Sequence, residues 1–355
     1  GGVSWLDVPR FVAAALAAAA AVVGVARGAD EGPAAPAADG PAAPAADAAG
    51  PSTLRGVDDD EDVGAASGSS LTTAGGEPLY DRVLKCDLLE ALPRPPQLVV
   101  LGGSRAMRFE PSFIRRLTGL RAFNFAVRAS RPEDAFAILS YMLARAPKVK
   151  LRVVYPLQTT AFADGPLHPV LLDDPRFSRW FPVELLRRER ARAGPTEPRG
   201  IPAVNRYDRR GGLLYNGYDE KLARGVTRRW ILRTYIERVL PGMARPGPPQ
   251  ERSRRYFEKT LALCNEHGIV PAVILMPYHP QALAAFRSVG WGDKHQEVLR
   301  YLHGLEGRYD LAVLDYTEIA SFGGDERFFY DGSHIMKQNA RRLLRQAVRD
   351  APQCF

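Results

Sequence analysis

The chain has few cysteines and lacks the motifs that mark metal, nucleotide and nucleic-acid sites. Its three cysteines, Cys86, Cys264 and Cys354, allow one disulfide at most, so they leave the redox compartment undecided. No Cys-x-x-Cys pair or Cys/His cluster has zinc-site spacing, so we expect no metal. Because neither Gly-x-Gly-x-x-Gly nor a P-loop ending in Gly-Lys-Ser/Thr is present, we also expect no nucleotide and no other cofactor.

The longest apolar run, Phe11 to Ala26, lies near the start and is flanked by Arg10 and Arg27. It is shorter than the roughly 17 to 25 residues of a bilayer-spanning helix, but it suits a signal-peptide core or a marginal anchor. The alternative is an Ala-rich buried helix, which would have little to pack against. Residues 1–27 are therefore predicted to be a signal peptide or membrane anchor. The remainder would then be extracytoplasmic, in the periplasm or on the outer face of the cell membrane.

Residues 28–75 are nearly all Ala, Gly, Pro, Asp, Ser and Thr, a composition that buries too little apolar surface to fold. We predict a disordered tether there. The tether has a net charge of −8 and residues 1–27 add +1, so the total of +8 leaves +15 on residues 76–355. A body this basic attracts lipid headgroups and acidic polymers. No recognition helix or RNA-binding motif accompanies the charge, so we expect no nucleic-acid partner.

From residue 97 onward, short apolar runs alternate with amphipathic helical patterns, as in a parallel sheet with crossover helices. This predicts an α/β fold, a three-layer sandwich around a mainly parallel five-stranded sheet. The expected strands are 97–101, 121–125, 149–155, 269–276 and 311–314. One expected helix begins at Pro111, and the others cover about 130–143, 256–266, 294–307 and 336–349.

Two local features refine this organisation. Ser130 and Glu133 have the spacing of a capping box at the start of a helix. Between residues 158 and 251 the alternating pattern gives way to Pro, Gly, Arg and aromatic residues. We interpret that stretch as a large cap-like insertion at the carboxyl ends of the strands, where ligands of such folds bind. Residues 76–355 are thus predicted to form one domain.

A serine follows the first predicted strand directly, in Gly102-Gly103-Ser104. The two glycines allow a sharp turn that exposes the hydroxyl at the edge of the sheet, as a nucleophile requires. A Gly-Gly-Ser turn can also bind phosphate, but the residues that complete such a site are missing.

Asp331 and His334 lie three residues apart, just before the last predicted helix. A serine hydroxyl needs a base to take its proton, and the base needs an acid to orient it. Alone, the two residues could equally be a helix cap and a surface histidine, and a metal site would need further ligands. Combined with Ser104, they predict a Ser-His-Asp triad.

The order of these features resembles the SGNH superfamily of GDSL-like serine esterases and acyltransferases. In that family the nucleophile follows the first strand, and an Asp-x-x-His motif precedes the last helix. The resemblance covers about residues 97–349, outside the insertion. It implies a flavodoxin-like SGNH fold in which Ser104 is the nucleophile, His334 the base and Asp331 the orienting acid.

The resemblance also implies an oxyanion hole made by the serine's own N–H, a second backbone N–H and a side-chain amide. Ala129 stands where the family has glycine, and a backbone donor tolerates that replacement. Gln158 is the amide offered in place of the family's asparagine, since no Gly-Asn-Asp is present at that point. Arg105, Tyr278 and His279 are predicted to bind substrate.

The Gly-Gly-Ser motif and the apolar N-terminus are similar to those of membrane-anchored SGNH-like proteins that work beside membrane-bound O-acyltransferases. That similarity implies an acyl donor, an envelope polysaccharide or polymer as acceptor, and a membrane-bound O-acyltransferase as partner. We therefore expect an extracytoplasmic serine O-acyltransferase or carbohydrate esterase, since hydrolysis is the same chemistry with water as acceptor. The alternative is a catalytically inactive accessory protein that keeps the fold to bind glycan or the acyltransferase.

Overall fold

A computed structural model describes residues 79–163, 165–192, 200–243 and 250–355. The predicted anchor and tether lie outside the described residues, so both stay predictions. None of the helices in the described ranges is long and apolar enough to cross a membrane.

The main sheet has five strands, and a short two-stranded ribbon stands apart from it. The strands of the sheet are β1 (Leu98–Val100), β2 (Ala122–Asn124), β3 (Arg152–Leu157), β6 (Ala272–Leu275) and β7 (Ala312–Asp315), and the ribbon pairs β4 (Arg206–Tyr207) with β5 (Leu213–Tyr215). The helices are α2 (Asp81–Glu90), α3 (Pro111–Thr118), α4 (Pro132–Arg145), α5 (Pro169–Asp173), α6 (Pro175–Ser178), α7 (Val183–Arg192), α8 (Gly217–Ala223), α9 (Arg228–Met243), α10 (Glu251–Glu266), α11 (Pro280–Arg287), α12 (Trp291–Leu305) and α13 (Lys337–Asp350).

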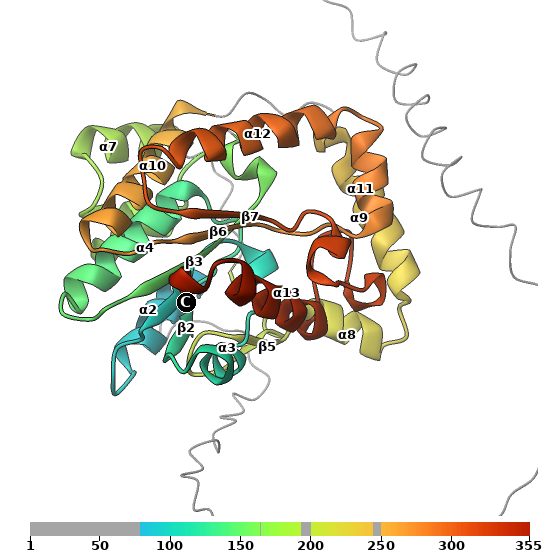
Figure 1. Ribbon diagram of the computed structural model, residues 1–355, viewed down its shortest axis with the longest axis horizontal. Helices are drawn as coiled ribbons and strands as arrows, with labels where there is room; N and C mark the ends of the chain where they lie inside the picture. The colour runs from blue at the N-terminus through green and yellow to red at the C-terminus, as the bar shows by residue number, and fades with distance from the viewer. Residues whose placement is uncertain (1–78, 164, 193–199, 244–249) are drawn as a thin grey trace, which may run out of the picture. The chain divides into compact units, whose positions relative to one another are not determined.

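All neighbouring strands of the main sheet are parallel, in the order β2-β1-β3-β6-β7. Figure 1 shows β7, β6 and β3 side by side. When the five strands are numbered by their order along the chain, they lie side by side in the order 2-1-3-4-5, which is the strand order of flavodoxin-like sheets. The predicted α/β class and five-stranded parallel sheet are confirmed.

Helices cover both faces of the sheet, which gives three layers. Val99 and Val153 pack in one apolar cluster with α2, α4, α10 and α12, whereas Val100 and Val154 pack in another with α3 and α13. Successive side chains of a strand point to opposite faces, so the central strands β1, β3 and β6 are buried along almost their whole length. This double burial explains why the strands read as unbroken apolar runs.

The predicted capping box at Ser130 and Glu133 is wrong by one residue. Helix α4 has Arg131 as its N-cap, and Asp134 Oδ2 accepts the backbone N–H of Arg131 at 2.8 Å. Glu133 is instead buried against Arg252, whose Nε lies 2.6 Å from Glu133 Oε1. The buried ion pair therefore takes the carboxylate that the sequence pattern assigned to the cap.

The segment predicted to be an insertion has two parts with different surroundings. Leu171, Phe177 and Leu185, from α5, α6 and α7, belong to the same apolar cluster as α4 and α10. The later part contributes α8 and α9, and Tyr235 of α9 lies against Gly332, where an added Cβ would come within 2.5 Å of its ring. The later part thus contacts the loop that carries Asp331 and His334.

Candidate active site

The chain leaves β1 through a turn that only glycine fits. Gly102 has φ +93°, and a Cβ at that position would lie 2.3 Å from the carbonyl oxygen of Pro156 on β3. An L-residue would therefore clash with the neighbouring strand as well as being strained. The turn brings Ser104 to the first position of a 3-10 helix, Ser104–Ala106, with its side chain half-buried.

Asn124, at the end of β2, fixes the backbone that follows Ser104. Its Nδ2 donates to the carbonyl oxygens of Ala106 and Phe109 at 2.9 Å and of Met107 at 3.2 Å. The Asn124 side chain is completely buried. Because three carbonyls after the nucleophile bind one side chain, the position of Ser104 is set by its neighbouring strand.

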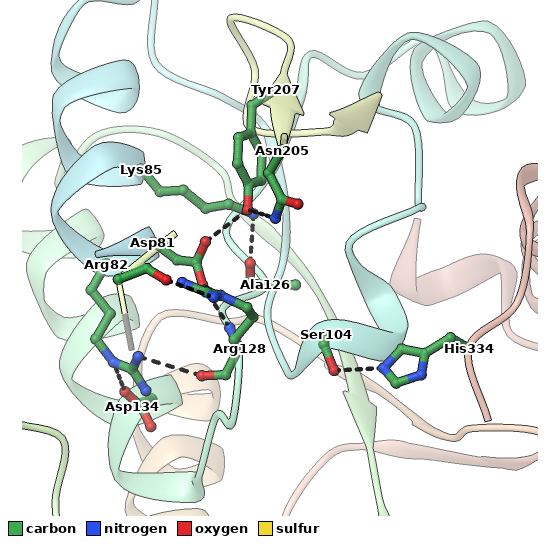
Figure 2. A network of polar contacts seen from close by, with 11 residues as sticks. Asp81, Arg82, Lys85, Ser104, Ala126, Arg128, Asp134, Asn205, Tyr207 and His334 are labelled. Atoms are coloured by element: carbon green, nitrogen blue, oxygen red, sulfur yellow. Dashed lines mark hydrogen bonds and ion pairs between the residues drawn. The ribbon is translucent and has the colours of Figure 1, made fainter. Parts of the chain in front are cut away.

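The three predicted triad residues meet in hydrogen-bonding geometry. Ser104 Oγ lies 2.9 Å from His334 Nε2, a contact visible in Figure 2, and His334 Nδ1 lies 2.8 Å from Asp331 Oδ2. Asp331 is 1% exposed, whereas the His334 side chain is 24% exposed. The acid is thus shielded from water, while the base stays within reach of a substrate.

Asp331 is held as a carboxylate by its surroundings. Its Oδ1 accepts the backbone N–H groups of Ser333 and His334, both at 2.8 Å, and its Oδ2 also accepts the hydroxyl of Tyr218. Burial alone would raise the pKa of Asp331, but the charge of His334 and these hydrogen bonds together hold that pKa well below its usual value. The anion fixes the Nδ1 proton of His334, which leaves Nε2 free to take the Ser104 proton.

No signal in the sequence connects Tyr218 with the predicted triad, because Tyr218 lies 113 residues before Asp331 on a short helix of the insertion. Its ring stacks on Tyr330 with centroids 5.5 Å apart and planes at 18°, and it lies 5.5 Å from the His334 ring. Tyr330 in turn donates to Asp219 Oδ1 at 2.6 Å, and Arg108 pairs with the same carboxylate. Helix α8 is therefore joined by aromatic and polar contacts to the loop that carries Asp331 and His334.

The two predicted oxyanion residues lie in segments that contact the nucleophile turn. Ala129 has φ +51°, the one positive φ of a non-glycine residue in the described ranges, and Val127 of the same loop donates its N–H to Gly102 O at 2.9 Å. The Gln158 amide lies beside Gly103, since a Cβ there would be 2.9 Å from Gln158 Nε2. Their role as oxyanion donors stays a prediction.

The predicted substrate residues Arg105, Tyr278 and His279 are all buried. Arg105 Nε donates to the carbonyl of Ser333 at 3.0 Å, its Nη2 donates to two carbonyls just after β6, and its guanidinium lies 4.1 Å from the Tyr278 ring centroid. The His279 N–H donates to the carbonyl of Gly332 at 3.0 Å. These residues brace the catalytic loop, and contact with substrate stays a prediction for all three.

Two observations on the described part of the chain concern metal ions and disulfides. That part contains no group of three or more His, Cys, Asp or Glu side chains that could hold a metal ion. Cys86, Cys264 and Cys354 are buried and unpaired with one another. Comparison with known proteins adds no family, because no protein-family model and no curated protein matches this chain.

Proposed function

We propose that this protein is a serine esterase or acyltransferase of the SGNH type. The observation that carries the proposal is the continuous hydrogen-bonded series from Ser104 through His334 to Asp331. The 2-1-3-4-5 strand order, the nucleophile after β1 and the Asp-x-x-His motif before α13 support the SGNH assignment.

In the proposed mechanism, Ser104 Oγ attacks the carbonyl carbon of an acyl donor while His334 Nε2 takes its proton. The imidazolium, stabilised by the Asp331 carboxylate, returns that proton to the leaving group, and an acyl-serine ester remains. His334 then deprotonates the acceptor hydroxyl, or water, which displaces Ser104 and restores the enzyme. The N–H of Ser104, the N–H of Ala129 and the Gln158 amide would stabilise the oxyanion.

The proposed acceptor is an envelope polysaccharide or polymer outside the cytoplasm, with the N-terminal segment as membrane attachment. The charge of +15 on residues 76–355 supports an anionic acceptor or surface. A membrane-bound O-acyltransferase is the proposed partner that would supply the acyl group.

A fluorophosphonate probe, which reacts covalently with activated serines, tests the proposal. Wild-type protein should be labelled, and Ser104→Ala should not. The matched control Ser321→Ala should be labelled like the wild type, because Ser321 is exposed and lies outside the proposed triad. A folded wild-type protein that resists labelling would instead support the inactive accessory role.

A further inference from the structure

Three charged residues on one helix, Asp81, Arg82 and Lys85 of α2, are almost completely buried. Their exposed fractions are 2%, 2% and 0%. Ionised side chains are rarely buried unless paired, and removing each from water costs several kcal/mol. The hydrogen bonds and ion pairs that compensate for the burial of these three residues indicate which part of the chain they hold in place.

Lys85 and Asp81 bind the chain as it leaves β2. Lys85 Nζ donates to the carbonyl oxygens of Asn124 at 3.0 Å and Ala126 at 2.5 Å, and Asp81 Oδ2 accepts both the backbone N–H of Arg128 at 3.2 Å and its Nε at 2.6 Å. Figure 2 shows these side chains converging on the loop that follows β2. Both hydrogen bonds of Lys85 Nζ go to backbone carbonyls, so this side chain fixes the main chain.

Arg82 extends the same set of contacts to the start of α4. Its Nε lies 2.6 Å from Asp134 Oδ1, and its Nη1 donates to the carbonyl of Arg128 at 3.4 Å. Asp134 also accepts the N–H of Arg131. The main chain of the 125–131 loop is therefore held on both sides of Ala129.

Ala129 adopts the left-handed φ of +51° between these anchor points. That conformation costs an alanine about 1–2 kcal/mol and persists only where the surroundings impose it. The same loop binds Gly102 through Val127, and Asn124, which accepts from Lys85, holds the turn after Ser104.

We propose that Lys85, with Asp81 and Arg82, is a positioning residue that holds the 125–131 loop so that the Ala129 backbone N–H serves as an oxyanion donor for Ser104. This inference rests on the proposed function. It assigns the charges of α2 to transition-state stabilisation, although none of them touches the reacting atoms.

The variant Lys85→Met tests the inference, because it keeps the apolar stem and removes the donor. With a chromogenic acyl ester, kcat should fall about 10- to 100-fold while KM stays within about twofold, since a misplaced donor acts only on the transition state. Amides of residues 125–131 should exchange with solvent faster in Lys85→Met. The exposed Lys148→Met is the matched control and should leave kcat, KM and exchange unchanged.

Adding Ala129→Gly to Lys85→Met should recover part of the lost kcat, because glycine adopts a positive φ without strain. Should Lys85→Met fail to fold, Tyr207→Phe removes only the hydroxyl that donates to Asp81 at 2.7 Å, and it should lower kcat less, again at constant KM.

An unchanged kcat in folded Lys85→Met, or a change mainly in KM, overturns the inference. The proposed function still stands in that case if the fluorophosphonate labels Ser104 of the wild type. A wild type that the fluorophosphonate does not label overturns the proposed function and this inference together.

Discussion

Replacing Lys85 with methionine should change how the stability of the protein depends on pH. Burial lowers the pKa of Lys85 to about 7, although the nearby charges of Asp81 and Asp208 oppose the shift. An unfolded lysine has a pKa of about 10.4. Between these two values the unfolded chain binds a proton that the folded chain does not. The contribution of Lys85 to the free energy of unfolding therefore rises with pH in this window, by about 1.4 kcal/mol per pH unit.

Urea unfolding of the wild type and Lys85→Met at pH 7.5 and pH 9 measures this term. The difference in unfolding free energy should move by about 2 kcal/mol in favour of the wild type at the higher pH. Buried tyrosines and cysteines titrate alike in both proteins, so they cancel in the difference. The exposed Lys148→Met should show no such change. A difference independent of pH would refute the reasoning, because it would mean that Lys85 keeps its proton in the folded protein.

Four further predictions concern the site and the surface. His334→Ala should lower kcat about 10⁶-fold and Asp331→Asn only about 10⁴-fold, since misorienting the base costs less than deleting it; equal losses in an ester assay would contradict this. Tyr218→Phe removes a donor that helps to orient the Asp331 carboxylate, so kcat should fall about 10-fold at constant KM; an unchanged kcat in an ester assay would exclude this support. Ala129→Gly should keep activity and change the free energy of unfolding by no more than about 1 kcal/mol, because relief of strain offsets the added flexibility of the unfolded chain. A large loss of unfolding free energy in a urea titration would argue against strain at this position. Co-sedimentation with an anionic polymer should weaken steeply with salt, since exposed charges are screened beyond about 8 Å, and retention insensitive to salt would leave the basic surface without this role. The exposed arginines of the insertion include Arg206, Arg209, Arg224, Arg228 and Arg229.

The sheet could be predicted because both of its faces are buried. Apolar runs such as 97–101 and 269–276 mark strands without ambiguity when helices cover both sides. The meeting of Ser104 with His334 could be predicted too, because nucleophile and base follow the ends of β1 and β7 in a fixed topology. Local sequence patterns and the expected strand order are therefore enough to predict the sheet and the meeting of Ser104 with His334.

Helix α2 could not be predicted by the same means. Its buried face mixes the charged residues Asp81, Arg82 and Lys85 with Cys86 and Leu89, so the apolar stripe that periodicity detects is interrupted. The contact of Tyr218 with Asp331 could not be predicted for a related reason, since only folding brings α8 to the loop that carries Asp331. Both depend on contacts between segments far apart in the chain, and no local signal records them.

The separation of the triad along the chain has a consequence for biosynthesis. Ser104 precedes His334 by 230 residues, and the base lies on the loop before the last helix. At about 5 to 20 residues per second, synthesis of the base follows that of the nucleophile by about 10 to 50 s. A nascent chain therefore carries Ser104 without His334, and the proposed acyl chemistry could begin only after the loop before α13 has been made and folded. The proposed ester-forming reactivity would thereby be confined to molecules that have been completed and folded.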